Sequence, residues 1–374
     1  MVPLIKWIEV KEVRDDVVRN WLEVMQSRPT IQLIENVQTE VRCIKIAEHW
    51  YLPVTINDKE NNNSYVVSPY NAYVPYAEEE LIRKVKSSIA VACIKPIIRC
   101  LDAFLKWTDI DRVIHINNFI FSTNPYGDWQ GEHIEELVSF LTGQFPKHLL
   151  IFRSLNHHQH KKLLQVNLKA GFTNIVSRQV YMFQPDYKAW VKHKNNGHDR
   201  RRIKKEALKY VDHQEMGAHL EDALQLYNQL YLQKYSIHNP RFTIEYFSQC
   251  YKRKLIYFQG YKDKDGKLVS FSGLFIYGNT ITSPLVGYNT ALPQEKGLYL
   301  HAIQLIFDFM LKTGLMLNLS SGASNFKKLR GGKPTIEYSS IYSAHLSAKT
   351  KLMTLLLWLV SNKIGKPLLE KYEL

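Results

Sequence analysis

The pattern of apolar and polar positions in the first half of the chain switches repeatedly between the period of a strand and that of a helix. Stretches that alternate, or that are wholly apolar and short, predict strands, and apolar residues three and four positions apart predict helices. The predicted strands are 41–46, 51–56, 113–121, 149–152 and 174–183, and the predicted helices are 87–107, 133–141 and 160–169. Strands that alternate with helices in this way indicate an α/β layer.

The second half of the chain has a more specific order. The predicted elements are a helix over 220–235, strands over 255–261, 268–277 and 280–288, a helix over 298–312 and a strand over 315–319. A turn containing Asp and Gly joins the first two strands, and Gly314 ends the second helix. Antiparallel strands therefore lead through a glycine-containing loop into a crossover helix.

Composition adds a size class and a charge. The chain has 374 residues, of which 45% are apolar and 22% charged, so an ordered protein of two domains is expected rather than a disordered one. Lys and Arg total 49 against 35 Asp and Glu, which gives a net charge of +14. Such a surplus favours a polyanionic partner, and nucleotide phosphates, a carrier protein, RNA and an anionic membrane surface all remain open.

Cysteine and histidine positions do not indicate a metal site. The four cysteines lack the Cys-x-x-Cys spacing of a zinc site, and no disulfide framework is expected; they are Cys43, Cys93, Cys100 and Cys250. A histidine cluster at 157–160 has no cysteine or acid that would complete a ligand set. We therefore expect no metal.

Targeting signals are also not evident. Residues 1–16 carry several charges and do not form the apolar region of a secretion signal. The longest apolar run, 352–360, is about half of the roughly 20 residues needed to cross a bilayer. With reduced cysteines, these features predict a cytoplasmic protein without a transmembrane segment.

A basic segment divides the two halves. Between Lys192 and Lys205 there are seven basic residues and a single acid, Asp199. The segment is either a solvated linker and helix start or a strip that binds phosphate or RNA.

The loop before the second-half crossover helix could hold a pyrophosphate. Backbone N–H groups in the first turn of a helix are unpaired and carry partial positive charge. The loop residues are Gln294, Glu295, Lys296, Gly297, Leu298 and Tyr299. Gly297 would allow close approach and Lys296 would add charge, although a plain strand-to-helix connection has the same features.

This order of elements, with its Gln-x-Lys-Gly-x-Tyr loop, resembles the GNAT acyltransferase superfamily, whose pyrophosphate loop follows a Gln/Arg-x-x-Gly-x-Gly/Ala pattern. Residues 318–332 leading into 336–342 look like the end of the acyltransferase domain in tandem-GNAT proteins related to the Fem-type peptidoglycan transferases. Residues 152–156 through 177–181 look like the matching end of the first half. Tyr299 departs from the pattern, because it stands where a second small residue is usual.

The resemblance implies an α/β (α+β) fold with two GNAT-like domains, each a mixed, largely antiparallel sheet flanked by helices. The expected divisions are an N-terminal domain over 1–190 that shapes the acceptor cleft, a basic linker over 191–205, a donor-binding domain over 206–348 and a C-terminal helix over 349–374. In this superfamily a β-bulge in the strand matched by 268–277 exposes N–H groups to the thioester carbonyl, and Gly273 is the candidate for it.

The resemblance also implies attack of a primary amine on a thioester. Tyr288 is the candidate proton donor, Glu337 a candidate base that could instead pair with Lys333, and Tyr338 its neighbour in the site. Ser321 is a candidate hydrogen-bond donor to substrate carbonyls, not a nucleophile, because it lacks partners spaced for that role. The expected donor-binding residues are Gln294, Lys296, Gly297, Leu298, Tyr299, Lys327 and Arg330.

The C-terminal segment over 349–366 sets an apolar run between lysines. It is interpreted as a core-packed helix, with a wall for a long acyl chain or a membrane-surface contact as alternatives.

The resulting hypothesis is an N-acyltransferase that moves an acyl group, with fatty acyl as one option, from a CoA or acyl-carrier-protein thioester to a primary amine. The amine belongs to a small molecule or to a Lys or ornithine side chain of a peptide. The alternatives are a Fem-like transferase that uses aminoacyl-tRNA, which the net charge would suit, and a non-catalytic binding protein with the GNAT fold.

Overall fold

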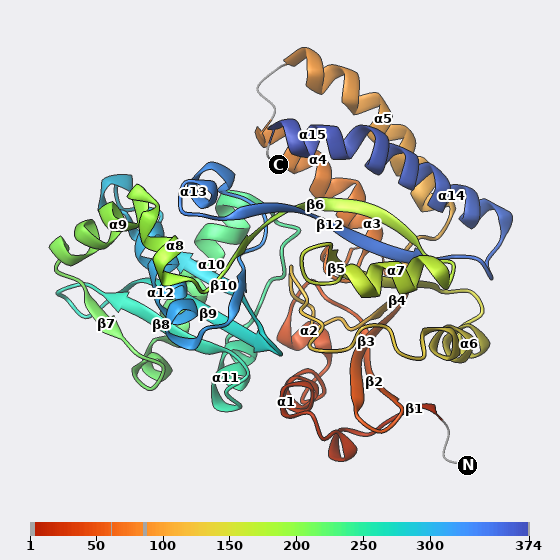
Figure 1. Cartoon of the computed structure of the whole chain (residues 1–374), viewed down its shortest axis with the longest axis horizontal. Helices are drawn as coiled ribbons and strands as arrows, with labels where there is room; N and C mark the ends of the chain where they lie inside the picture. The colour runs from red at the N-terminus through yellow and green to blue at the C-terminus, as the bar shows by residue number, and fades with distance from the viewer. Residues whose placement is uncertain (1–3, 61, 85–87, 373–374) are drawn as a thin grey trace. The chain divides into compact units, whose positions relative to one another are not determined.

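The computed structural model describes residues 4–60, 62–84 and 88–372 (Figure 1). The chain forms two compact units. Unit 1 comprises Met1–Ile31, Asn36–Gln179 and Thr335–Leu374, and unit 2 comprises Gln32–Glu35 and Val180–Pro334. Two strands, β6 (Thr173–Phe183) and β12 (Lys333–Tyr342), and the short helix α2 (Thr30–Leu33) contain residues of both units.

The sheet of unit 1 has the strand order β1-β2-β3-β4-β5-β12-β6. Its other strands are β1 (Ile5–Trp7), β2 (Glu40–Ile46), β3 (Trp50–Asp58), β4 (Arg112–Ile116) and β5 (Leu149–Asn156). Only β4 and β5 are parallel among the pairs β1–β2, β2–β3, β3–β4, β4–β5 and β5–β12. The helix α6 (Ile134–Gln144) connects this parallel pair, as a crossover connection requires.

The remaining helices of unit 1 are η1 (Val10–Glu12), α1 (Asp16–Met25), α3 (Pro69–Tyr73), α4 (Pro75–Lys84), α5 (Ser88–Trp107), α7 (Lys161–Lys169), α14 (Ala348–Leu359), η5 (Val360–Gly365) and α15 (Lys366–Tyr372). Side chains on both faces of the sheet are buried, Ile114 in one cluster and Val113 in another. Strand β4 is therefore covered on both sides, and its residues from Val113 to Ile116 are all buried.

Unit 2 repeats this plan. Its strand order is β6-β11-β10-β9-β8-β7, with β7 (Lys209–Val211), β8 (Tyr257–Lys262), β9 (Leu268–Tyr277), β10 (Thr280–Tyr288) and β11 (Met316–Asn318). The parallel pair is β10–β11, connected by α12 (Leu298–Thr313), and the other pairs are antiparallel. The other helices are α8 (Tyr187–Lys192), α9 (Lys194–Lys205), η2 (Glu215–His219), α10 (Leu220–Tyr227), η3 (Asn228–Tyr235), α11 (Ile244–Lys252), η4 (Gln294–Lys296) and α13 (Ser324–Lys328).

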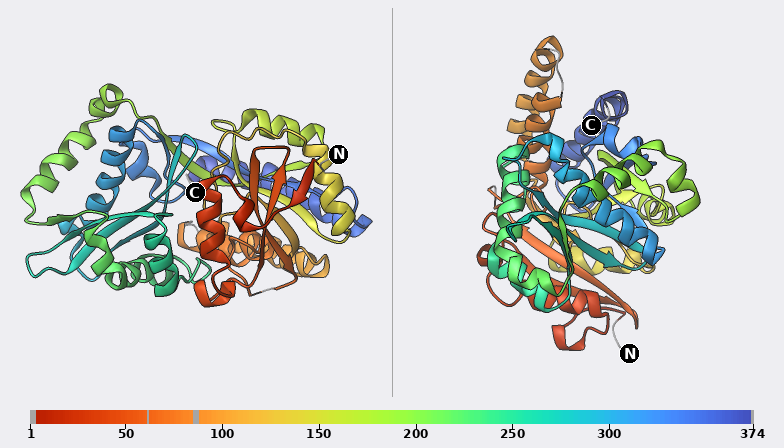
Figure 2. Two further views of the ribbon diagram at one scale, coloured as in Figure 1. Left: turned by 90° about the horizontal axis from the view of Figure 1, so that it is seen from below. Right: turned by 90° about the vertical axis from the view of Figure 1, so that its left-hand side faces the viewer.

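Helices cover both faces of the unit 2 sheet, with α12 on one side and α10 on the other (Figure 2). Successive residues of β10 point to opposite faces. Val286 packs with Ile303 of α12, whereas Gly287 lies so close to α10 that a Cβ atom would meet the Tyr227 backbone nitrogen at 2.7 Å. Gly287 therefore lets α10 approach the strand that leads into the loop before α12.

Most predicted elements are confirmed. The hairpin β2–β3, the helices α6, α7 and α12, and the strands β8 to β11 lie where the sequence pattern places them. The predicted strand over 113–121 ends early at Ile116, because Asn117 has a left-handed φ of 56° and breaks the extended backbone. The predicted fold class, mixed and largely antiparallel sheets flanked by helices, is confirmed.

The predicted domain boundaries stay a prediction, and the compact units differ from them in two respects. Residues 335–374 belong to the same unit as the N-terminal half, because β12 pairs with β5. The predicted linker over 191–205 is mostly helical: Asp186 caps α8, and α9 follows after one residue. Within the part of the chain that the structure describes, no helix is long and apolar enough to span a membrane.

Candidate functional site

Unit 2 contains a cavity of about 440 Å³. Its walls come from α9, η3, the end of β10, the loop after β10, the start of α12 and α13. Of the expected donor-binding residues, Gln294, Gly297, Leu298, Tyr299 and Arg330 line it. The candidate proton donor Tyr288 lines the same cavity, so the loop and this tyrosine, predicted separately, lie together.

The loop before α12 has the geometry of an anion site. It makes one 3-10 turn, η4, after which Gly297 adopts a left-handed φ of 62° and caps α12. The Gly297 carbonyl accepts from the His301 backbone N–H, so the N–H groups of the first turn have no partner within the helix. Lys296 is exposed beside this turn. The helix terminus therefore contributes partial positive charge here, and Lys296 precedes it in the chain but is not among the residues that line the cavity.

His301, in the first turn of α12, lies beneath this loop. Its imidazole is fully buried, and Nδ1 donates to the Gly297 carbonyl over 2.9 Å. Burial lowers its pKa. The side chain supports the loop backbone.

The basic segment contributes directly to the cavity. Arg202 of α9 donates to the Glu295 carbonyl, and its guanidinium carbon is 3.2 Å from the position that a Cβ atom on Gly297 would occupy. Sequence analysis did not assign Arg202 to the site. A usable signal was present, because Asp199 and Arg202 are three residues apart and lie on one face once the segment is helical.

Tyr288 has a cationic partner that sequence analysis also missed. The Lys234 ammonium donates to the Tyr288 hydroxyl oxygen over 2.8 Å. This hydrogen bond raises the pKa of Lys234, so the side chain stays charged. The ring of Tyr299 lies 5.9 Å from that of Tyr288 and 5.1 Å from that of Phe326, and burial raises the pKa of its hydroxyl. Tyr299 thus forms an aromatic wall of the cavity.

The parallel strands of unit 2 separate next to the cavity. Pairing of β10 with β11 covers only Thr280 to Thr282, although β10 continues to Tyr288. An extra residue in β10 between Thr282 and Leu285 marks the point of separation. The irregularity expected at Gly273 of β9 is therefore found in β10: the extra residue is on β10, and Gly273 pairs with Leu285 at the border of the register shift.

Lys327 and Arg330 are bound within the protein. The Lys327 ammonium is buried and donates to the carbonyls of Leu319, Ser320 and Ser321 over 2.6, 3.1 and 2.7 Å. Arg330 makes two contacts with the Asp199 carboxylate, at 2.5 and 3.0 Å, and stacks 3.5 Å from the centre of the Phe326 ring. Both side chains fix the loop that carries Ser321, and the Arg330 ion pair fastens this loop to α9.

Glu337 and Tyr338 belong to unit 1 and are not among the residues that line the 440 Å³ cavity of unit 2. Glu337 pairs with Arg178 over 2.8 Å rather than with Lys333. Burial disfavours the charged Arg178, but the Glu337 carboxylate outweighs this effect and raises the pKa of Arg178. Tyr338 points to the other side of β12, is buried in the core and contacts the His157 ring at 5.4 Å.

The Glu337–Arg178 pair lines a second, smaller cavity of about 70 Å³ within unit 1. Arg153, half-buried, donates to the Val66 carbonyl, and Ser154 has a left-handed φ of 64° where β5 bulges against β12. Glu337 Oε2 and Ser154 Oγ are buried and accept or donate no hydrogen bond among the described residues. Such atoms are costly unless a ligand or water meets them, so this cavity can bind a small polar group.

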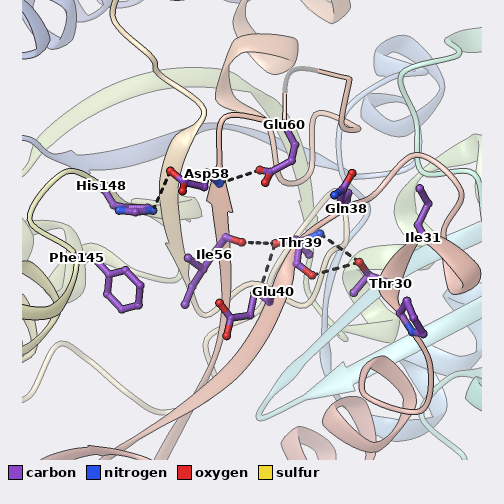
Figure 3. A pocket seen from close by; sticks show the side chains of 11 residues that line it. Thr30, Ile31, Gln38, Thr39, Glu40, Ile56, Asp58, Glu60, Phe145 and His148 are labelled. Atoms are coloured by element: carbon purple, nitrogen blue, oxygen red, sulfur yellow. Dashed lines mark hydrogen bonds and ion pairs between the residues drawn. The ribbon is translucent and has the colours of Figure 1, made fainter.

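A third cavity, of about 620 Å³, is also in unit 1 (Figure 3). Its acidic residues are already engaged: Asp58 pairs with Arg112 over 2.9 Å, and Glu60 accepts from the Asp58 backbone N–H over 2.8 Å. His148 lies 3.9 Å from Asp58, and burial lowers its pKa. This cavity is acidic in a basic protein, but its charges are locally balanced.

Among the described residues, no group of three or more His, Cys, Asp or Glu side chains could hold a metal ion. In the histidine cluster, Nδ1 of the buried His160 accepts from the Asn156 backbone N–H over 3.2 Å. Burial lowers the pKa of His160 to about 3, so the ring is neutral.

Comparison with known proteins identifies the fold. A family model described as a domain of unknown function (DUF4852) matches residues 174–310, and no curated protein matches the chain. The crystal structure of FemX is similar over 94% of this chain and 99% of FemX, with a TM-score of 0.54 at 9% identity. The C-terminal domain of a putative lysylphosphatidylglycerol synthetase from Agrobacterium fabrum covers 62% of this chain and 78% of its own, with a TM-score of 0.43 at 15% identity. A tandem GNAT protein from the clavulanic acid biosynthesis pathway covers 90% and 97%, with a TM-score of 0.38 at 8% identity.

The FemX likeness extends over nearly the whole of both chains. The protein therefore shares its fold with FemX.

Proposed function

We propose that the protein is an N-acyltransferase that takes an acyl group from a phosphopantetheine thioester, on CoA or on a carrier protein, and transfers it to a primary amine. The observation that supports this most directly is the unit 2 cavity, where the α12 N-terminus, Arg202 and the Lys234–Tyr288 pair lie beside the separation of β10 from β11. A positive helix terminus suits the donor phosphates, and separated strands leave room for the extended pantetheine arm.

In the proposed reaction, the neutral amine nitrogen attacks the thioester carbonyl carbon, a C–N bond forms and the C–S bond breaks. The leaving thiolate takes a proton from the Tyr288 hydroxyl, and the proton that the amine loses returns to Tyr288 through solvent. The transient tyrosinate would lie 2.8 Å from the Lys234 ammonium, which stabilises it. This balance requires no metal and no redox partner.

We assign acceptor recognition to unit 1. The small cavity beside the Glu337–Arg178 pair supports this assignment, because buried Glu337 Oε2 accepts no hydrogen bond among the described residues. In this proposal Glu337 and Ser154 bind a polar group of the acceptor. The acyl length is an outcome of the binding assay below.

The donor claim is tested by calorimetric binding of acetyl-CoA, a C10 to C16 acyl-CoA series and an acyl carrier protein. Lys296→Ala is expected to weaken donor binding by roughly fivefold, the value of about 1 kcal/mol of charge interaction. Lys312→Ala is the matched control, because it removes the same charge from an exposed position at the opposite end of α12. Equal affinity of both variants and the unchanged protein would refute the phosphate site.

The acid role is tested by Tyr288→Phe, which keeps the ring. Donor binding should change little, while kcat should fall by roughly 10² to 10⁴. Salt-dependent tRNA binding without binding of any pantetheine donor would instead favour the Fem-like alternative. Binding of neither tRNA nor a pantetheine donor would favour the alternative of a non-catalytic binding protein with this fold.

A further inference from the structure

Helix α14 exposes its more apolar side. Four leucines lie along one face at spacings of three, one and three residues: Leu352, Leu355, Leu356 and Leu359 are 48, 52, 37 and 38% exposed. We call these four residues the leucine face. The opposite, buried side of the helix includes two threonines, Thr350 and Thr354. A helix that serves only as part of a core would have the reverse arrangement.

The buried side of α14 fixes the direction of the leucine face. Met353 and Leu357 pack in a core cluster that also contains Leu105 of α5. Lys349 donates to the Trp107 carbonyl at the end of α5 over 3.2 Å. Both helices belong to unit 1, and Figure 1 shows α14, α15 and α5 near one another at its edge. The leucines therefore point away from the core to which α14 is attached.

The charged residues of this segment of the chain are all positive. Lys351 and Lys363 are exposed at its two ends, and Lys349 and Lys366 lie further out. The sequence contains no Asp or Glu from residue 338 to residue 369. The Lys363 ammonium lies 5.7 Å from the centre of the Trp358 ring, and tryptophan favours the boundary between lipid and water.

We propose that the leucine face and its flanking lysines dock the protein on an anionic lipid surface. The helix would lie in the plane of the interface, with the leucines at the acyl boundary and the lysines among anionic headgroups. A symmetric contact between two copies is disfavoured, because it would bring two sets of lysines together without an acid between them. None of the three cavities described above includes a residue of α14, which argues against an acyl-chain wall. This proposal does not depend on the proposed function.

The test is co-flotation of the full chain with vesicles of phosphatidylcholine alone or with 30% phosphatidylglycerol. The protein should float with the anionic vesicles and bind the neutral ones at least tenfold more weakly. The double variant Lys351→Glu and Lys363→Glu should lose on the order of thirtyfold in affinity for anionic vesicles, since each basic residue near such a surface contributes about fivefold. Leu355→Asp with Leu359→Asp should lose at least tenfold.

Leu168→Asp is the matched control, because Leu168 is an exposed leucine on α7, outside the leucine face. It should float like the unchanged protein, and far-UV circular dichroism should show all variants folded. The proposal is overturned if the unchanged protein does not float, or if the Leu355 and Leu359 variant floats as well as the control. A dimer in light scattering that this variant abolishes, without vesicle binding, would assign the face to self-association instead.

Discussion

Lys327 offers the clearest separation between a ligand-binding role and a structural one. The sequence places Lys327 among the expected donor-binding residues, whereas in the structure its ammonium donates to three backbone carbonyls inside unit 2. We expect Lys327→Met to destabilise unit 2 and to leave the intrinsic donor affinity of the folded protein nearly unchanged.

The expected loss of stability depends on which carbonyls lose their hydrogen-bond donor. Ser320 keeps a second donor, the Tyr181 backbone N–H at 3.2 Å, so the Leu319 and Ser321 carbonyls are the ones deprived. Leaving a buried acceptor unsatisfied costs about 1–3 kcal/mol, which gives roughly 2–6 kcal/mol for two. Removing a buried ammonium offsets part of this cost, so about 3–4 kcal/mol is expected.

The assay is urea denaturation monitored by circular dichroism, with Lys328→Met as the control. Lys328 is the exposed neighbour on the same short helix, and its replacement should change the free energy of unfolding by less than about 0.5 kcal/mol. Thermal midpoints should fall by roughly 6–16 °C for Lys327→Met, at about 2–4 °C per kcal/mol. Unchanged stability together with lost donor binding would refute the structural role of Lys327.

Three further predictions concern other parts of the chain. Burial lowers the pKa of His160 from 6.5 to about 3, so between these pH values the unfolded state binds a proton that the native state does not. The stability that the neutral His160 contributes is therefore present above pH 6.5 and is lost as the pH falls toward 3. In denaturation titrations between pH 6 and 4, His160→Gln should reduce the pH dependence of the unfolding free energy by about 1.4 kcal/mol per pH unit. Gly287→Ala should lower the free energy of unfolding by more than about 2 kcal/mol, because the new Cβ atom would meet the backbone of α10. Its control is Gly143→Ala within α6, where a Cβ atom would lie in open space, and this variant should be neutral or stabilising by up to about 1 kcal/mol in the same assay. Glu337→Gln removes the charge that faces Arg178 and should cost about 3–5 kcal/mol in denaturation; a change below 1 kcal/mol would contradict the buried pair.

Much of the fold follows from local pattern. In the second half, apolar residues spaced by two positions predict the strands, and apolar residues spaced by three to four positions predict the helix. The strands β8 to β11 and the helix α12 lie at the predicted positions. The loop around Gly297 follows from its position between a predicted strand and a predicted helix, and Gly297 has the left-handed φ of 62° that favours glycine. Short edge strands such as β1 and β7 carry only three residues each and give too little periodicity to detect.

Side-chain partners required the tertiary structure. Glu337 meets Arg178 across 159 residues of sequence because β12 joins the sheet of unit 1, and no local spacing encodes that pairing. The same reason explains why Lys327 and Lys234 could not be sorted beforehand into ligand-binding and structural cations. The sequence by itself determined most of the longer helices and strands, the mixed α/β fold class and the loop before α12, since these depend on neighbours within a few residues. Only the tertiary structure decided which charged side chains form ion pairs and hydrogen bonds inside the protein and which line a cavity, because burial and ion pairing depend on segments brought together by folding.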